Sequence, residues 1–296
     1  MTAATPAISK PRKLATRRKM TSRRFFRRSA LNLTAVVVFA LMVFPVYWMV
    51  ITAFKPGVDI FKLEPKFFPS PATLANFREA LSYPNFWDVT KNSFIIVGSV
   101  VVISTALAFL AGLALARFRF YGRRAFVILI IGIQMVPLSA LIIPLYVLLS
   151  RYHQVNKLSG VVIAHLIFVL PFAIWTLRGF IIGIPKELEE AAMVDGLTRF
   201  GAFVRILFPL IAPGLVATSI YAFIQSWNDY LYAYILLSSP EKQTLTIWLA
   251  SFTTVRGTQW GPLMAAATLT SLPIVIFFLA VHRKLAFGLT AGAVKS

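Results

Sequence analysis

Uncharged, strongly apolar runs alternate with short polar segments along almost the whole chain. Several runs reach eighteen residues or more, and a helix needs about 20 apolar residues to cross the hydrocarbon layer of a bilayer. The pattern therefore predicts an all-α, polytopic transmembrane helical bundle of about six spans. We place the spans at residues 31–53, 92–116, 125–149, 160–182, 207–237 and 263–281. The fifth contains several polar residues, so we expect it to be broken, bent or shorter than the others.

Composition supports a membrane class. The chain has 296 residues, of which 58% are hydrophobic and 14% charged, and a soluble domain of this size needs more charge to cover its surface. We divide it into a basic tail, residues 1–30, expected to be disordered, and a membrane domain, residues 31–296, which includes a charged loop at 183–206. The absence of cysteine excludes disulfides, thiol catalysis and thiolate metal sites.

The basic residues that give the net charge of +20 are distributed as expected for a protein at a membrane surface. Ten Lys and Arg and no acid occupy the first thirty residues, directly before the first span. With six spans, the tail, two alternate loops and the C-terminus hold 21 of the 30 basic residues, which predicts that both termini and the loop 183–206 are cytoplasmic. Attraction to anionic lipid explains the basic tail, so we expect membrane lipid and no nucleic acid as its partner.

The loop 183–206 has the signals of two short helices joined by a glycine elbow. Pro185 suits a first helical turn, and Gly196 suits the left-handed position that ends a helix. Thr198 is a candidate cap for the second helix. Helical spacing places Phe200, Phe203, Val204 and Leu207 on one face of it. Two interpretations remain open: a lever that lies in a partner's groove, or an interfacial hairpin that holds the bundle together.

This loop resembles the cytoplasmic EAA coupling loop of ABC import permeases. The pattern is Glu190-Ala191-Ala192, two residues, Asp195-Gly196, and then Ile206 and Pro209, with Phe203 between them. Leu197 stands where the family often has Ala. The segments 227–230, 240–246 and 288–295 resemble the carbohydrate-uptake branch of the family, in particular its maltose-type second permease subunit.

The resemblance implies a type I ABC importer permease fold and a non-catalytic subunit that forms half of an alternating-access pore for sugars or oligosaccharides. The implied partners are a homologous second permease, two copies of an ATPase subunit and an extracytoplasmic sugar-binding protein, in the cell membrane of a prokaryote. This chain would bind no cofactor, and ATP and Mg would be used by the ATPase; no G-x-x-x-x-G-K-[ST] phosphate loop is present. The implied coupling residues are Glu190, Ala191, Ala192, Asp195, Gly196, Phe203, Ile206 and Pro209. Two alternatives remain for the segment 288–295: it also contacts the ATPase, or it is simply disordered.

Polar and aromatic residues within the spans are candidates for a sugar pathway, because a neutral, hydroxyl-rich solute is bound by amides, hydroxyls and aromatic faces. They are Gln134, Gln225, Trp227, Asn228, Asp229 and Tyr230. Hydrogen bonding between helices is the alternative role for each.

A secondary transporter of a small polar solute is the alternative class, although no internal repeat is apparent and Asp229 is the one acid in a span. Spacing supports no Ser–His catalytic pair and no metal site.

Overall fold

In the computed structural model, residues 22–292 are described, with side chains from residue 29 to residue 281. The expectations for residues 1–21 and for the end of the segment 288–295 lie outside this range. The chain divides into two compact units after Trp48. The five longest helices are α1 (Ser22–Ala53), α4 (Phe86–Arg117), α7 (Leu158–Ile182), α10 (Phe208–Trp227) and α13 (Trp260–Gly292).

The predicted all-α membrane bundle is confirmed. Within residues 22–292, five helical segments are long and apolar enough to cross a membrane, and a bent pair brings the number to six if it counts as one span. This pair is the predicted span 125–149, which is not continuous: α5 (Arg123–Gln134) is followed, at an angle of 98°, by η1 (Leu138–Leu141) and α6 (Ile142–Arg151).

Proline chemistry explains the break. Pro137 has no N–H to donate, and it disfavours helical backbone at the residue before it. Carbonyl groups freed at such a break are costly in a membrane unless another group satisfies them. The Tyr232 hydroxyl donates to the carbonyl oxygen of Leu138 at 2.6 Å, so one of these groups has a partner from a distant segment.

The predicted fifth span ends early. α10 stops at Trp227, ten residues before the expected end, and a separate short helix, α11 (Leu231–Leu236), follows. The carboxylate of Asp229 accepts hydrogen bonds from the backbone N–H groups of Tyr232 and Ala233, at 3.3 and 3.0 Å, at the start of α11. Asp229 therefore starts a new helix instead of lying inside a span, because a carboxylate stabilises the positive end of a helix.

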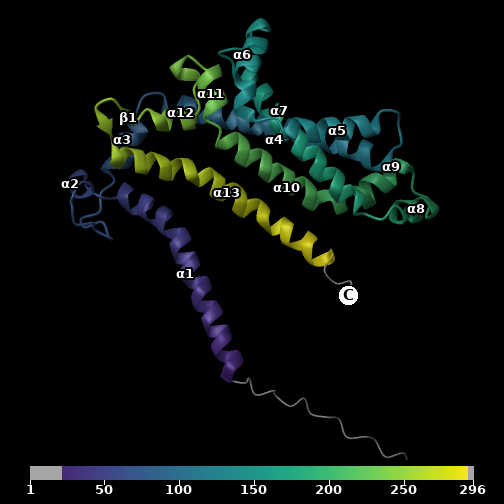
Figure 1. The fold of residues 1–296 in the computed structure, drawn as a ribbon, viewed down its shortest axis with the longest axis horizontal. Coiled ribbons are helices and arrows are strands. Elements are labelled where there is room, and N and C mark those ends of the chain that lie inside the picture. The colour runs from purple at the N-terminus through teal and green to yellow at the C-terminus, as the bar shows by residue number, and fades with distance from the viewer. Residues whose placement is uncertain (1–21, 293–296) are drawn as a thin grey trace, which may run out of the picture. The chain divides into compact units, whose positions relative to one another are not determined.

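Small residues allow α4 and α7 to pack closely. Ser104, Ala108 and Gly112 recur every fourth residue on the buried side of α4. A Cβ atom at Gly112 would lie 3.1 Å from the backbone nitrogen of Arg178 on α7, closer than side chains normally approach. α10 packs against both helices and α13 packs along α10 (Figure 1). This spacing of small residues is the usual way for membrane helices to gain dispersion contacts.

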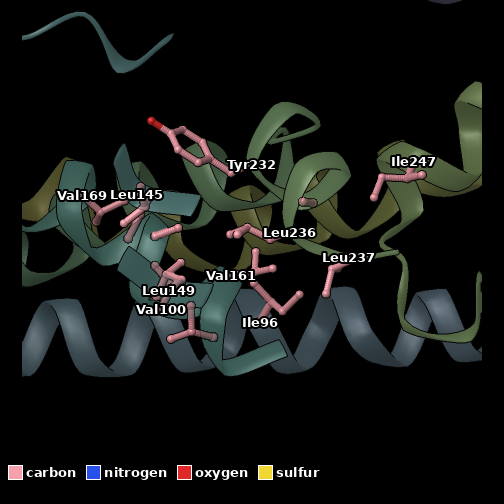
Figure 2. Close-up of a cluster of buried hydrophobic side chains, with 14 residues drawn as sticks. Ile96, Val100, Leu145, Leu149, Val161, Val169, Tyr232, Leu236, Leu237 and Ile247 are labelled. Carbon is pink, nitrogen blue, oxygen red and sulfur yellow. The ribbon is translucent and has the colours of Figure 1, made fainter. Parts of the chain in front are cut away.

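Figure 2 shows one of the resulting cores. Side chains of α4, α6, α7 and α11 meet there, for example Val100, Leu149, Val161 and Leu236. The core fastens α6, which follows the first break, and α11, which follows the second, to the long helices α4 and α7.

Short elements connect the long helices. α8 (Glu187–Val194), α9 (Arg199–Ala202) and the π-helical turn η2 (Phe203–Leu207) lie near the start of α5 at one end of the bundle (Figure 1). At the other end are α2 (Gly57–Ile60), α3 (Ala75–Ser82), α11, η3 (Pro240–Lys242), α12 (Leu245–Ala250) and the antiparallel pair β1 (Thr253–Thr254) and β2 (Gly257–Thr258).

Candidate functional site

The charged loop forms a helical hairpin with a glycine at its turn. Gly196, at φ +91°, donates its N–H to the carbonyl of Met193, and Leu197 donates to that of Ala192. This pair of bonds is the Schellman arrangement that closes a helix, and it requires a left-handed residue at the position of Gly196. The hydroxyl of Thr198 accepts from the N–H of Gly201 at 3.1 Å, which confirms Thr198 as the cap of the second helix.

The second helix differs from the expected amphipathic helix. Pro209 cannot donate to the carbonyl of Arg205, and the chain instead forms the π turn η2, in which the Phe208 N–H bonds to the carbonyl of Phe203. The predicted single apolar face is therefore wrong. Leu207 is fully buried in the bundle's own core and Phe203 is half-buried against Phe109, whereas Phe200 and Val204 face outward.

The coupling residues inferred from sequence fall into an outward set and an inward set. Glu190, Ala191, Asp195 and Pro209 are exposed, while Phe203 and Ile206 are half-buried. Ala192, one of the coupling residues that the resemblance implies, is buried within its own chain. Exposed apolar side chains accompany the outward set, led by Val194 and Phe200, which are 87% and 74% exposed. The hairpin therefore exposes both apolar groups and carboxylates.

An ion pair that the sequence did not reveal fixes this hairpin to the bundle. Arg117, at the end of α4, donates from Nε to Oε1 of Glu189 at 2.7 Å and from Nη2 to the carbonyl of Ile184 at 3.0 Å. Both side chains are largely shielded from solvent, so the pair is stronger than an exposed one. Because α9 also continues through η2 into α10, the hairpin is attached to two membrane helices.

Replacing Arg117 by Ala should loosen the hairpin without unfolding the bundle. Each of the two lost hydrogen bonds involves a charged group and contributes at most about 1.5–3 kcal/mol. Part of this loss should lower the free energy of local unfolding of the hairpin. Hydrogen exchange should accelerate in residues 184–196 and stay unchanged in α7. Glu187→Gln, which alters an exposed carboxylate on the same helix, is the matched control. Equal protection in wild type and Arg117→Ala would show that the ion pair does not hold the hairpin.

A second polar network ties the break after α10 to α7. Nε2 of His165 lies 3.1 Å from Oδ2 of Asp229, and Nδ1 of His165 lies 2.6 Å from the hydroxyl of Ser226. Nδ1 of His165 is hydrogen-bonded to Ser226, whereas Nε2 lies close to the carboxylate of Asp229 without the geometry of a hydrogen bond. Sequence spacing gave no sign of this Ser–His–Asp set. His165 is 1% exposed and Ser226 is also buried, so the set stabilises the fold and is not accessible to a substrate.

Four of the six candidate pathway residues, Trp227, Asn228, Tyr230 and Gln225, make contacts within the chain. Trp227 is buried, with its ring stacked on Phe223 and its Nε1 donating to the carbonyl of Thr270, so its indole cannot meet a solute in this structure. Asn228 bonds back to the carbonyl of Ile224, and Tyr230 stacks on Tyr234. Gln225 donates to the hydroxyl of Tyr221 at 3.0 Å.

A cavity of about 140 Å³ lies beside the break between α5 and α6. Gln134 lines it, together with the side chains of Tyr221, Phe168 and Phe172, which the sequence had not singled out. Tyr221 and Phe172 stack at 3.9 Å between ring centres. No charged residue lines this cavity. Among the described residues, no cluster of three or more His, Cys, Asp or Glu is placed to hold a metal ion.

The structure defines a helical membrane bundle with a capped, polar hairpin attached to two of its long helices. Residues 104–290 match the family described as "Binding-protein-dependent transport system inner membrane component". The chain belongs to this family, whose members are the membrane permease subunits of ABC importers and not enzymes. It is thus a multi-pass membrane protein, and family membership sets the secondary-transporter alternative aside.

Named relatives are similar over nearly their whole length. The chain is 45% identical over 273 residues to the diacetylchitobiose uptake system permease protein DasC of Streptomyces coelicolor, covering 92% of this chain and 99% of that one. It is 31% identical to the trehalose/maltose transport system permease protein MalG of Thermococcus litoralis, covering 91% and 97%. A crystal structure of a bacterial ABC transporter that imports the acidic polysaccharide alginate has the same fold, with a TM-score of 0.75, 21% identity and coverage of 94% and 99%.

Proposed function

We propose that this chain is one of two homologous pore-forming subunits of an ATP-driven importer for sugars or oligosaccharides. The observation that carries the proposal is the attachment of the α8–α9 hairpin. Arg117 fastens α8 to the end of α4, and α9 continues through η2 into α10. A displacement of the hairpin therefore reaches two membrane helices through hydrogen-bonded structure.

The outward surface of the hairpin suits a groove on an ATPase subunit. Exposed Val194 and Phe200 supply apolar anchors, and the free carboxylates of Glu190 and Asp195 supply charge for specificity. The complex would contain a second permease and two ATPase copies, which use ATP and Mg. A sugar-binding protein outside the membrane completes it, and this is supported by the structure of an alginate transporter in complex with a periplasmic protein that holds an alginate pentasaccharide.

The names of the relatives point to oligosaccharides, since they specify diacetylchitobiose, trehalose or maltose, and arabinooligosaccharides. The cavity beside the α5–α6 break suits a neutral, hydroxylated solute, because Gln134 and aromatic faces line it without a charge. Its volume of about 140 Å³ is below the roughly 300–1,000 Å³ typical of ligand sites, so the path must widen during transport.

We further propose that both termini and the hairpin lie in the cytoplasm of a prokaryotic cell, on the strength of the charge distribution. The absence of cysteine makes this measurable with single-cysteine variants. A membrane-impermeant maleimide should label Glu64→Cys, at an exposed position between α2 and α3, in intact cells, and Glu190→Cys only after the membrane is opened. Labelling of Glu190→Cys from outside would reverse the orientation.

The importer itself is tested by purifying the tagged chain from its native membranes and reconstituting the complex in vesicles. An ATPase subunit and a second permease should accompany the chain, and ATP hydrolysis should rise when a sugar-loaded binding protein is added. Glu190→Lys should remove the ATPase while the second permease stays bound. A folded chain that purifies alone, with no nucleotide hydrolysis, would refute the proposal.

A further inference from the structure

A basic hollow lies beside the hairpin and takes no part in the coupling argument. Its volume is about 890 Å³, and it is formed by the turn between α4 and α5, the first turns of α5 and one residue of α7. The lining residues include four arginines and no acid: Arg119, Arg123, Arg124 and Arg178. Four like charges around one hollow repel each other unless an anion occupies it.

These guanidinium groups have no hydrogen-bond acceptor and no acidic partner within the part of the chain that the structure describes. No hydrogen bond or ion pair of their side chains is present there, and Nε of Arg178 is buried without an acceptor. Arg117, two residues before Arg119, is by contrast fully paired with Glu189 and Ile184. Arg178 stays in place because its backbone packs against Gly112 and its guanidinium lies 5.3 Å from the ring centre of Trp175.

The start of α5 adds a second source of positive potential. The first N–H groups of a helix have no partner within it, and the helix dipole makes this end positive. α5 has no acidic residue in its first turn and no side-chain cap, and Arg123 and Arg124 stand there instead. Gly122, at φ +84°, turns the chain into this helix. Two arginines at a helix N-terminus are unfavourable unless an anion lies between them and the exposed N–H groups.

Apolar surface continues directly from this charged hollow. Phe126, Ile128 and Leu129 are exposed along α5, and Ile128 also lines the hollow. Tyr121 is fully exposed at the tip of the turn, as is common for aromatic residues at a membrane–water interface. A soluble anion would use the arginines but not this apolar surface, whereas a phospholipid uses both.

We propose that the hollow binds the phosphate group of an anionic phospholipid, whose acyl chains lie along α5. The proposal rests on the orientation proposed above, in which this end of the bundle faces the cytoplasmic leaflet. Arg123 and Arg178 hold the phosphate from the two helices, and Arg119 and Arg124 supply further charge. The bound lipid joins the α4–α5 turn to the end of α7, five residues before the hairpin segment begins at Gly183.

Thermal unfolding of the purified complex in neutral detergent, with defined additions, tests this proposal. Cardiolipin or phosphatidylglycerol should raise the unfolding temperature of wild type, whereas phosphatidylcholine and inorganic phosphate should not. Native mass spectrometry should detect the retained anionic lipid. The pair Arg123→Gln/Arg178→Gln should lower the apparent affinity for cardiolipin at least about tenfold, which corresponds to losing one charge-assisted contact. Arg151→Gln, at an exposed arginine at the end of α6, is the matched control and should behave as wild type.

The same variants separate lipid binding from a loss of folding. In neutral detergent without added lipid, Arg123→Gln/Arg178→Gln should be as stable as wild type or more stable, because it removes repulsion. An equal shift with inorganic phosphate would assign the hollow to a soluble anion and overturn the lipid proposal. Destabilisation of the double variant regardless of lipid would assign the arginines to contacts with a partner subunit, and would overturn it as well. A complex that keeps its ATPase but shows no preference for anionic lipid would refute this inference alone.

Discussion

Replacing Gly196 by Pro should abolish sugar uptake while the chain still inserts and folds in the membrane. Proline cannot adopt φ +91°, and it removes the N–H that bonds to the carbonyl of Met193. The Schellman turn between α8 and α9 would open, at a cost of about 3 kcal/mol or more, and the hairpin would lose the shape that presents Val194 and Phe200 together. Gly196→Ala, strained by about 1–2 kcal/mol at a left-handed position, should weaken ATPase binding about tenfold.

Uptake, membrane level and co-purification of the ATPase check this result together. Gly179→Ala in α7 is the matched control, because a Cβ there meets no other group and the backbone is helical. Glu190→Lys reverses an exposed charge without straining the backbone, so it tests the surface separately from the shape of the turn. Normal uptake by both Gly196→Pro and Glu190→Lys would refute the role of the hairpin as the coupling element.

Replacing Asp229 by Ala should be the most destabilising single change in the polar interior of the bundle. The substitution removes the two bonds that start α11, and it leaves His165 buried without its carboxylate. Each hydrogen bond to a charged group contributes about 1.5–3 kcal/mol, and Asp229 accepts two of them from the backbone of α11. The unfolding temperature in detergent should therefore fall sharply, and the amount of chain in the membrane should fall with it.

A double variant distinguishes this network from a simple loss of helix capping. If His165 and Asp229 depend on each other, His165→Ala/Asp229→Ala should be much less destabilised than the sum of the two single variants. Asp88→Asn, at an exposed acid in the first turn of α4, is the control and should change stability by less than about 1 kcal/mol. Additive effects in the double variant would show that the 3.1 Å contact contributes nothing of its own.

The network of His165, Ser226 and Asp229 also fixes the position of the chain where α10 ends. His165 on α7, Ser226 on α10 and Asp229 before α11 meet where the fifth span ends, and the Thr246 hydroxyl of α12 donates to the carbonyl of Asp229 at 2.6 Å. This corner therefore has fixed geometry. Among the described residues, the α5–α6 break receives one side-chain hydrogen bond from a distant segment, that of Tyr232, so its geometry depends more on apolar packing than on polar contacts.

Features that depend on neighbouring residues could be predicted from the sequence. Apolar length identified the membrane helices, and Gly196 and Thr198 marked the turn and the cap of the hairpin, because helix ends are satisfied within a few residues. The same local rules did not determine the backbone geometry at Pro137 and Pro209. A proline within an apolar run is compatible with a kink, a 98° break or a π turn, and packing selects among them.

By itself, the sequence determined that this protein is a polytopic helical membrane protein with a two-helix loop, since apolar periodicity and end signals are local. Tertiary structure alone decided what holds that loop and which polar groups meet. Arg117 and Glu189 are 72 residues apart, His165 and Ser226 are 61 apart, and Arg178 reaches a hollow formed by residues 119–128. Such pairs form because close packing of α4, α7 and α10 brings distant positions within hydrogen-bonding range, and no pattern along the chain encodes that distance.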